Sequence, residues 1–185
     1  MNLLLYHENN VVDSDNFVSN GIVHVIDGVL LPLWVLSSLT DHVFENFDIS
    51  TLFSLLVLTG IDLSYPAADP VTVAGPTNDA FDLLDPAVVE FLTTTPDDLI
   101  ELTRILQYHV FSGTFPISIF FDDFVENGGQ VEVSVATLER GTVFVSIASQ
   151  LLFNQASAAS AKEMANNGVL FRIFQGLDPY DGGLR

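Results

Sequence analysis

The histidines are the side chains of this chain best suited to bind a metal ion or to move a proton. They are His7, His24, His42 and His109. No two of them stand at i and i+4 on an expected helix, and their separations match no zinc or other transition-metal site. We therefore expect no metal ion.

Carboxylates are numerous, and one group of them resembles part of a calcium loop. Asp122 and Asp123 precede Glu126 and the Asn127–Gly129 turn. The regular odd-position ligands and the terminal glutamate of a calcium loop are missing. A solvated acidic loop is the favoured interpretation.

Nucleophilic catalysis would need a serine, a base and an orienting acid brought together. The chain has no Gly-x-Ser-x-Gly turn to expose such a serine and no glycine-rich phosphate loop. The Asn127–Gly129 segment fits better as a turn before a strand. We expect a protein that is not an enzyme and that holds no cofactor.

The composition excludes several classes of partner. The 24 acidic residues outnumber the five Lys and Arg residues, giving a net charge of −19 that repels nucleic acid and anionic membranes. Apolar stretches such as Leu30–Leu36 are too short to span a bilayer.

Met1–Glu8 is not a secretory signal, so a secreted parent protein would carry its signal upstream. Without cysteine, disulfides and thiolate metal sites are impossible.

Helices are expected in the first half of the chain. Apolar side chains at helical spacing predict two helices within Trp34–Thr59, the first with Leu39, Val43 and Phe47 on one stripe. Asp48 or Ser50 is the expected cap of the second helix.

Two further helices are predicted from their first residues. A short strand at Val71–Val73 is followed by Thr77, whose side chain suits a helix cap. Thr95 caps the next helix, with Pro96 at its first position, and the apolar stripe of this helix runs to Tyr108.

Strands are expected toward the carboxyl end. Val131–Val135, Val143–Ile147 and Leu151–Phe153 are predicted strands, the first two from alternation of period two. The alanine-rich Ala156–Ala165 predicts a helical turn or two. Helices first and strands last favour the α+β class with largely antiparallel strands.

A buried polar cluster is expected where two of these elements meet. Thr77 and Asn78 offer side-chain oxygens to the free amides of a helix start. His109 lies one residue beyond an apolar helical stripe. We predict that His109 is largely buried and bonded to the Thr77–Asn78 turn, a structural role favoured over ligand binding.

A block near the amino end returns near the carboxyl end. The two blocks are Asn20–Pro32 and Asn167–Pro179, and the offset between them is 167 − 20 = 147 residues. Each begins with an Asn-Gly pair, which we expect to form a positive-φ turn. A strand-like run, a leucine and a proline follow in both. We predict that residues 1–32 are the closing segment of a preceding domain, that 33–180 form a complete domain, and that 181–185 are a tail. The strand edges of 1–32 should dock onto the second domain or pair with another copy.

Three segments together resemble the signatures of fasciclin-type domains. Val71–Phe81 is similar to the first signature, with Ala74-Gly75 where Phe-Ala is usual. Leu106–Gly113 matches the Leu-x-Tyr-His-Val-x-x-Gly signature. Asn20–Pro32 matches the closing element well, whereas Asn167–Pro179 has Phe171 and Phe174 at its usual His and Asp positions. We expect the first two signatures to lie close together in the fold.

The resemblance implies a small wedge-shaped β-sandwich with several helices packed at one edge. It also implies an extracellular or cell-surface adhesion module, commonly in tandem, that binds proteins, glycans or matrix. In some relatives the pair matched by Tyr108 and His109 is assigned adhesive activity.

Two alternatives remain open at this stage. Some relatives carry a carotenoid, and Phe115, Phe120, Phe121 and Phe124 could line a groove for a carotenoid or lipid, although a core role for these rings is favoured. The chain could also be an architectural spacer without a specific ligand.

Overall fold

The sheet of the main body is built around one parallel pair of strands. The computed structural model describes residues 9–66, 68–87, 90, 94–115, 131–147, 150–177 and 179. Seven strands follow one another in the order β4-β3-β9-β8-β7-β6-β5. β3 (Val71–Pro76) runs parallel to β9 (Gly168–Ile173), and every other pair of neighbours is antiparallel.

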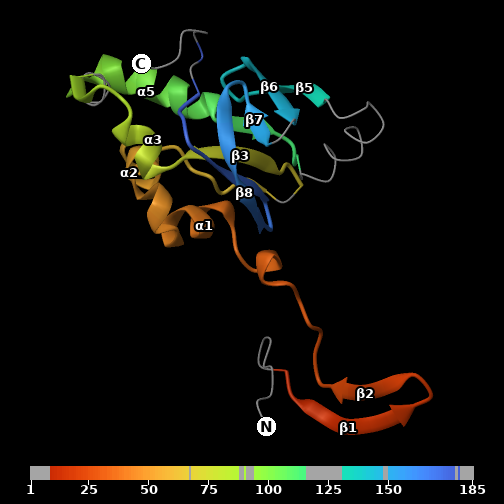
Figure 1. The fold of residues 1–185 in the computed structure, drawn as a ribbon. Helices are drawn as coiled ribbons and strands as arrows, with labels where there is room; N and C mark the ends of the chain where they lie inside the picture. Colours follow the sequence, from red (N-terminus) through yellow and green to blue (C-terminus); the bar gives the residue numbers. More distant parts are fainter. Residues whose placement is uncertain are drawn as a thin grey trace.

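The two outer strands of this sheet approach each other. An isolated bridge joins Phe111 in β4 to Thr137, which follows β5, so the sheet curls almost into a barrel. Figure 1 shows the helices gathered to one side of the sheet. The predicted α+β class, a small wedge-shaped β-sandwich with several helices packed at one edge, is confirmed. The remaining strands are β4 (Val110–Ser112), β5 (Val131–Ala136), β6 (Thr142–Ile147), β7 (Leu151–Phe153) and β8 (Ala156–Ala165).

Side-chain caps set the starts of three helices. Ser38 caps α1 (Leu39–Glu45) in a reciprocal capping box. The predicted caps Thr77 and Thr95 are confirmed: each side chain accepts a backbone N–H bond at the start of its helix. These helices are α3 (Asn78–Asp82) and α5 (Pro96–Tyr108).

The helix α2 (Ser50–Thr59) starts differently from the prediction. The side chain of Asn46 accepts the N–H of Asp48 and so caps the short 3-10 helix Phe47–Ile49. α2 continues directly from that turn without a side-chain cap, so neither Asp48 nor Ser50 caps it. Gly60 follows the last residue of the helix in the left-handed conformation, with φ of 69°. Its N–H donates to the carbonyls of Leu56 and Val57, which satisfies acceptors at the helix end.

The central strands β3 and β9 are buried on both faces. One face packs against α1, α2 and α5, and Leu170 of β9 lies in that core. The other face lines the inside of the curled sheet, where Phe153 stands 5.6 Å from Phe111 and 5.4 Å from Phe171 between ring centroids. Because β9 is covered on both faces, its sequence is an unbroken apolar run before Arg172.

Two predictions along the chain are wrong. Ala156–Ala165 is the strand β8, since pairing with β7 and β9 outweighs the small helical preference of alanine. Phe47 does not continue the stripe of Leu39 and Val43, which are buried; it is 89% exposed, because α1 ends at Glu45 and the chain turns.

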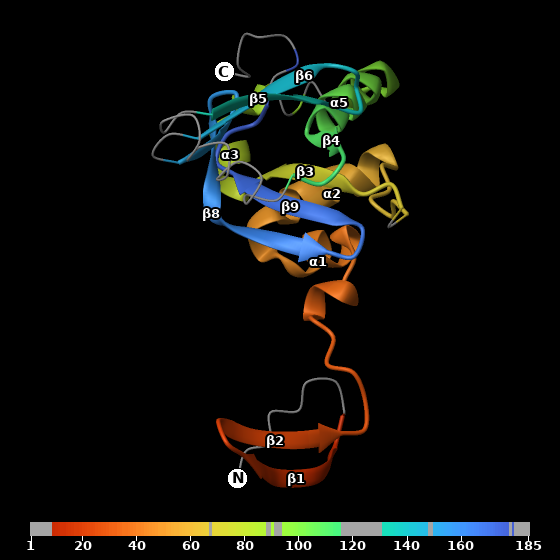
Figure 2. The same cartoon turned by 90° about the vertical axis from the view of Figure 1, so that its right-hand side faces the viewer.

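A separate hairpin precedes the body. β1 (Val11–Val18) and β2 (Gly21–Ile26) pair antiparallel, and this N-terminal hairpin (9–27) stands apart from the body in Figures 1 and 2. Of the two arrangements expected for this hairpin, docking onto the second domain is therefore wrong, and pairing with another copy stays a prediction. The outer strands of the body, β4 and β5, approach each other at the Phe111–Thr137 bridge, and among the described residues neither of them forms a ladder with the hairpin.

Candidate functional site

The two signature segments meet where α5 runs into β4. β4 follows α5 directly and pairs antiparallel with β3, with Val73 opposite Val110. The N–H of Ala74 also donates to the carbonyl of His109 at 2.9 Å. The expectation that these segments lie together is confirmed.

His109 is buried and holds a defined neutral tautomer. Nδ1 lies 2.8 Å from the carbonyl oxygen of Ile105, which can only accept, so Nδ1 carries the proton. The N–H of Leu177 donates to Nε2 at 2.8 Å. Burial lowers the pKa of His109 from 6.5 to about 4, although the Ile105 bond favours the charged form.

The burial predicted for His109 is confirmed, and the predicted bonding partner is wrong. The side chain is 3% exposed. Both ring nitrogens are occupied by backbone groups, so neither reaches the Thr77–Asn78 turn. His109 instead satisfies the carbonyl of Ile105 near the end of α5 and ties Leu177 to that end.

Tyr108 joins the end of α5 to the sheet. Its hydroxyl donates to the carbonyl of Thr142 at 2.7 Å, and its side chain is 5% exposed. Gly141 lies so close that an added Cβ would stand 2.5 Å from the ring carbon Cε2 of Tyr108. Tyr108 and His109 thus fix the junction of helix and sheet, and a partner on the protein surface would touch neither polar group.

Thr77 and Asn78 hold two helices together. The N–H of Ala80 donates to the Thr77 hydroxyl oxygen at 3.3 Å. Asn78 reaches the other helix: its Oδ1 accepts the N–H of Thr51 at 3.0 Å and its Nδ2 donates to the Phe47 carbonyl at 2.8 Å. This cluster clamps α3 to the start of α2 without His109.

Asn167, in the repeated block, is a structural clamp that the sequence reasoning missed. Its Oδ1 accepts the N–H of Leu39 at 2.8 Å and its Nδ2 donates to the carbonyl of Leu63 at 2.9 Å. The repeat pointed to this asparagine, but a positive φ was expected for the next residue. Gly168 does not have one; a Cβ there would lie 2.1 Å from the Val71 carbonyl oxygen, so close approach requires the glycine.

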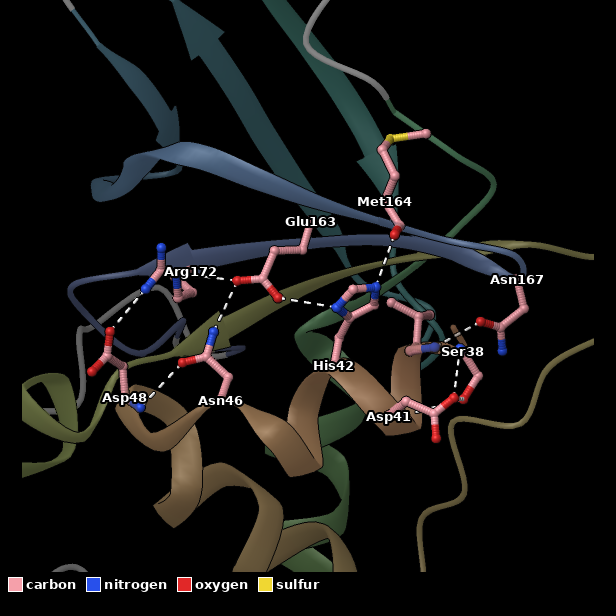
Figure 3. A network of polar contacts seen from close by, with 10 residues as sticks. Ser38, Asp41, His42, Asn46, Asp48, Glu163, Met164, Asn167 and Arg172 are labelled. Atoms are coloured by element: carbon pink, nitrogen blue, oxygen red, sulfur yellow. Dashed lines mark hydrogen bonds and ion pairs between the residues drawn. The ribbon is translucent and has the colours of Figure 1, made fainter. Parts of the chain in front are cut away.

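A network of polar side chains that sequence reasoning missed joins the segment from α1 to Asp48 to the strands β8 and β9, as Figure 3 shows. Glu163 stands 3.3 Å from Nδ1 of His42 and accepts a bond of 2.8 Å from Asn46. Arg172 bonds Asp48 at 2.8 Å. The partners come from segments more than 100 residues apart, so spacing gave no signal.

This network borders a surface hollow of about 340 Å³. The lining residues are His42, Glu45, Asn46, Phe47, Asp48 and Glu163. The described residues contain no group of three or more side chains arranged to hold a metal ion. They also contain no helix with the length and apolar character needed to span a membrane.

Several predicted features fall outside the described residues. The acidic loop at Asp122 and Asp123 is among them, as are Phe120, Phe121 and Phe124. Phe115 is described and packs, partly buried, against the core inside the curled sheet.

Comparisons with known proteins agree with the fold. The profile of the fasciclin domain family matches residues 47–179. Human periostin is 25% identical over 171 residues, which cover 91% of this chain and 19% of periostin. Protein sll1483 of Synechocystis is 29% identical over 143 residues, covering 72% of this chain and 69% of that protein.

A solved structure is also similar. The FAS1 domain pair from the insect cell adhesion molecule Fasciclin I aligns with a TM-score of 0.63 at 16% identity, covering 92% of this chain and 60% of that chain. The chain thus spans about a fifth of periostin and 60% of this domain pair.

Proposed function

Because this chain belongs to the fasciclin domain family, we propose that it is an adhesion-type binding module acting outside the cell or at its surface. The observation that carries the proposal is the family match over 47–179 together with the fold shared with a pair of domains from a cell adhesion molecule. The partners are proteins, glycans or matrix surfaces.

The binding surface is proposed to lie on outer loops, with Tyr108 and His109 in a positioning role. Both side chains are buried and bonded to backbone groups. They hold the α5–β4 junction in place, so a change at either acts on binding through the fold. This role also supports a module without catalysis, since both nitrogens of its buried histidine are already occupied.

Charge favours cationic partners for this surface. The net charge is −19, and the hollow beside His42 is bordered by Glu45, Asp48 and Glu163. Attraction between an acidic module and a basic surface weakens as salt screens it over about 10 Å at 0.1 M. Individually weak contacts gain strength when modules are repeated in one chain.

The repeat supports the proposed domain organisation of 1–32, 33–180 and 181–185. In the N-terminal hairpin Val18 pairs with Gly21, and 147 residues later Ala165 pairs with Gly168. The bond from Asp27 N–H to the Asn10 carbonyl likewise has a counterpart from Phe174 to Ser157. The same offset relates the pairs Val11↔Ile26, Asn16↔Val23 and Phe17↔Ile22 to Ala158↔Ile173, Glu163↔Leu170 and Met164↔Val169. The hairpin is thus the counterpart of β8 and β9 for a preceding domain.

A solid-phase adhesion assay tests the binding function. The purified chain is titrated onto surfaces coated with cells or matrix extract, beside an inert protein of the same acidic pI of about 4.1. Saturable binding above that control, reduced by added salt, is expected. Binding equal to the control at every concentration contradicts the proposal.

A further inference from the structure

The outer edge of β2 has no strand beside it among the described residues, although its counterpart in the body is covered. β1 and β2 form a two-stranded sheet, whereas β9 lies between β8 and β3. We propose that the outer edge of β2 is an acceptor site for one parallel strand of the β3 type, supplied by the body of a preceding domain. This inference rests on the domain organisation proposed above and adds the partner and its register.

The complete domain gives the register of the incoming strand. β3 pairs with β9 from Val71↔Gly168 to Pro76↔Ile173. Subtracting the offset of 147 places the same strand against Gly21–Ile26.

The hydrogen bonds at the two ends of the β3–β9 ladder show which backbone groups of β2 point toward its open edge. Val71 N–H donates to the Asn167 carbonyl at 3.2 Å, and Thr77 N–H donates to the Ile173 carbonyl at 2.9 Å. Alternate residues of a parallel strand face the same neighbour. The groups of β2 that face the open edge are therefore those of Ile22 and His24, flanked by the carbonyls of Asn20 and Ile26.

The side chains of β2 are more exposed than those at the equivalent positions of β9. Val169 and Leu170 of β9 are 0% exposed, whereas their counterparts Ile22 and Val23 are 51% and 49% exposed. In Gly21–Ile26 one face carries Val23 and Val25 and the other carries Ile22 and Ile26 with His24 between them, so both faces hold apolar side chains, as in a strand covered on both sides. An isolated two-stranded hairpin is marginally stable in water, so a covering partner stabilises it.

Asn20 adds a second requirement on the partner. Its counterpart Asn167 clamps a helix start through Leu39 N–H and a loop through the Leu63 carbonyl. Asn20 is exposed and has the same position before β2. The partner that fits is therefore a domain body that brings both a strand and a helix start.

A second copy of this chain does not supply the strand. Its β3 already lies between β4 and β9, with both edges paired. Pairing of two N-terminal hairpins with each other is the competing arrangement, and it predicts a different response to dilution.

The test uses the full chain labelled with ¹⁵N and a capped probe peptide with the sequence of residues 70–77 of this chain. A nitroxide on the amino end of the peptide reports direction. We expect amide shifts confined to the N-terminal hairpin and centred on β2, with stronger broadening at Gly21 than at Ile26.

Two N-methylated peptides form a matched pair of probes. The Val73 N–H faces β9 by the alternation above, whereas the Ala74 N–H faces away, donating to the His109 carbonyl at 2.9 Å. Methylation at Val73 is expected to weaken binding at least about tenfold, because it removes a ladder bond and leaves an acceptor unpaired. Methylation at Ala74 is expected to leave the affinity equal to that of the unmethylated peptide.

Every other result overturns the inference. These results are no shift at millimolar peptide, stronger broadening at Ile26, shifts centred on β1 or β4, equal affinity of the two methylated probes, or concentration-dependent pairing of the hairpins through β2. The adhesion assay is independent of this experiment, so a failure here leaves the proposed binding function standing.

Discussion

Replacing His109 by glutamine is expected to remove an acid sensitivity from the fold. The folded protein holds His109 neutral, with its pKa lowered to about 4 from 6.5, mainly through burial. Between these two values the unfolded chain binds a proton that the folded chain does not. Stability is therefore complete above pH 6.5 and falls as the pH drops toward 4.

The size of this effect follows from the two pKa values. A shift from 6.5 to about 4 makes the free energy of unfolding about 2 kcal/mol smaller at pH 5 than at pH 7. The loss levels off at about 3 kcal/mol below pH 4. Asp41, whose pKa is lowered by its bonds to Ser38, titrates below its ordinary 3.8 and so acts outside this window.

Urea unfolding at pH 7, 6 and 5 measures the difference. Glutamine at position 109 keeps an acceptor for the Leu177 N–H, and asparagine in a second variant keeps a donor for the Ile105 carbonyl. Neither amide titrates. Relative to its own value at pH 7, the wild type should lose about 2 kcal/mol more than either variant by pH 5. Parallel curves for all three proteins would refute the lowered pKa assigned to the buried His109.

Three further substitutions test the packing and the repeat. Gly141→Ala places a Cβ against the Tyr108 ring, and urea unfolding should show a loss of about 1–3 kcal/mol from overpacking; an unchanged midpoint would show that the ring moves at no cost. Asn167→Ala leaves two buried backbone groups unpaired, and the same assay should show a loss of about 2–5 kcal/mol. Asn20→Ala, at the exposed counterpart, should change stability by less than about 0.5 kcal/mol; equal losses from the two asparagines would contradict the difference between the two hairpins.

Local signals predicted the elements that depend on a few neighbouring residues. Thr77 and Thr95 were recognised as caps because an oxygen before a helix start binds a nearby amide. The alternation at Val143–Ile147 identified a strand with one face buried. The three segments that resemble the fasciclin signatures, taken together, identified the fold.

Features set by distant partners were not predictable in the same way. Ala156–Ala165 forms a strand because two other strands pair with it, and alanine content carries no sign of them. The partners of His109 are backbone groups at Ile105 and Leu177, and a backbone group has no identity in the sequence. Spacing also gave no reason to join His42 to Glu163.

The central claim is that the folded domain binds through its outer surface while Tyr108 and His109 act from within. The most direct test is the affinity of the wild type and of His109→Gln for one coated surface at pH 7, with both proteins shown to be folded by circular dichroism. Equal affinities, both above that of the inert acidic protein, are expected. A folded variant that no longer binds would contradict the claim.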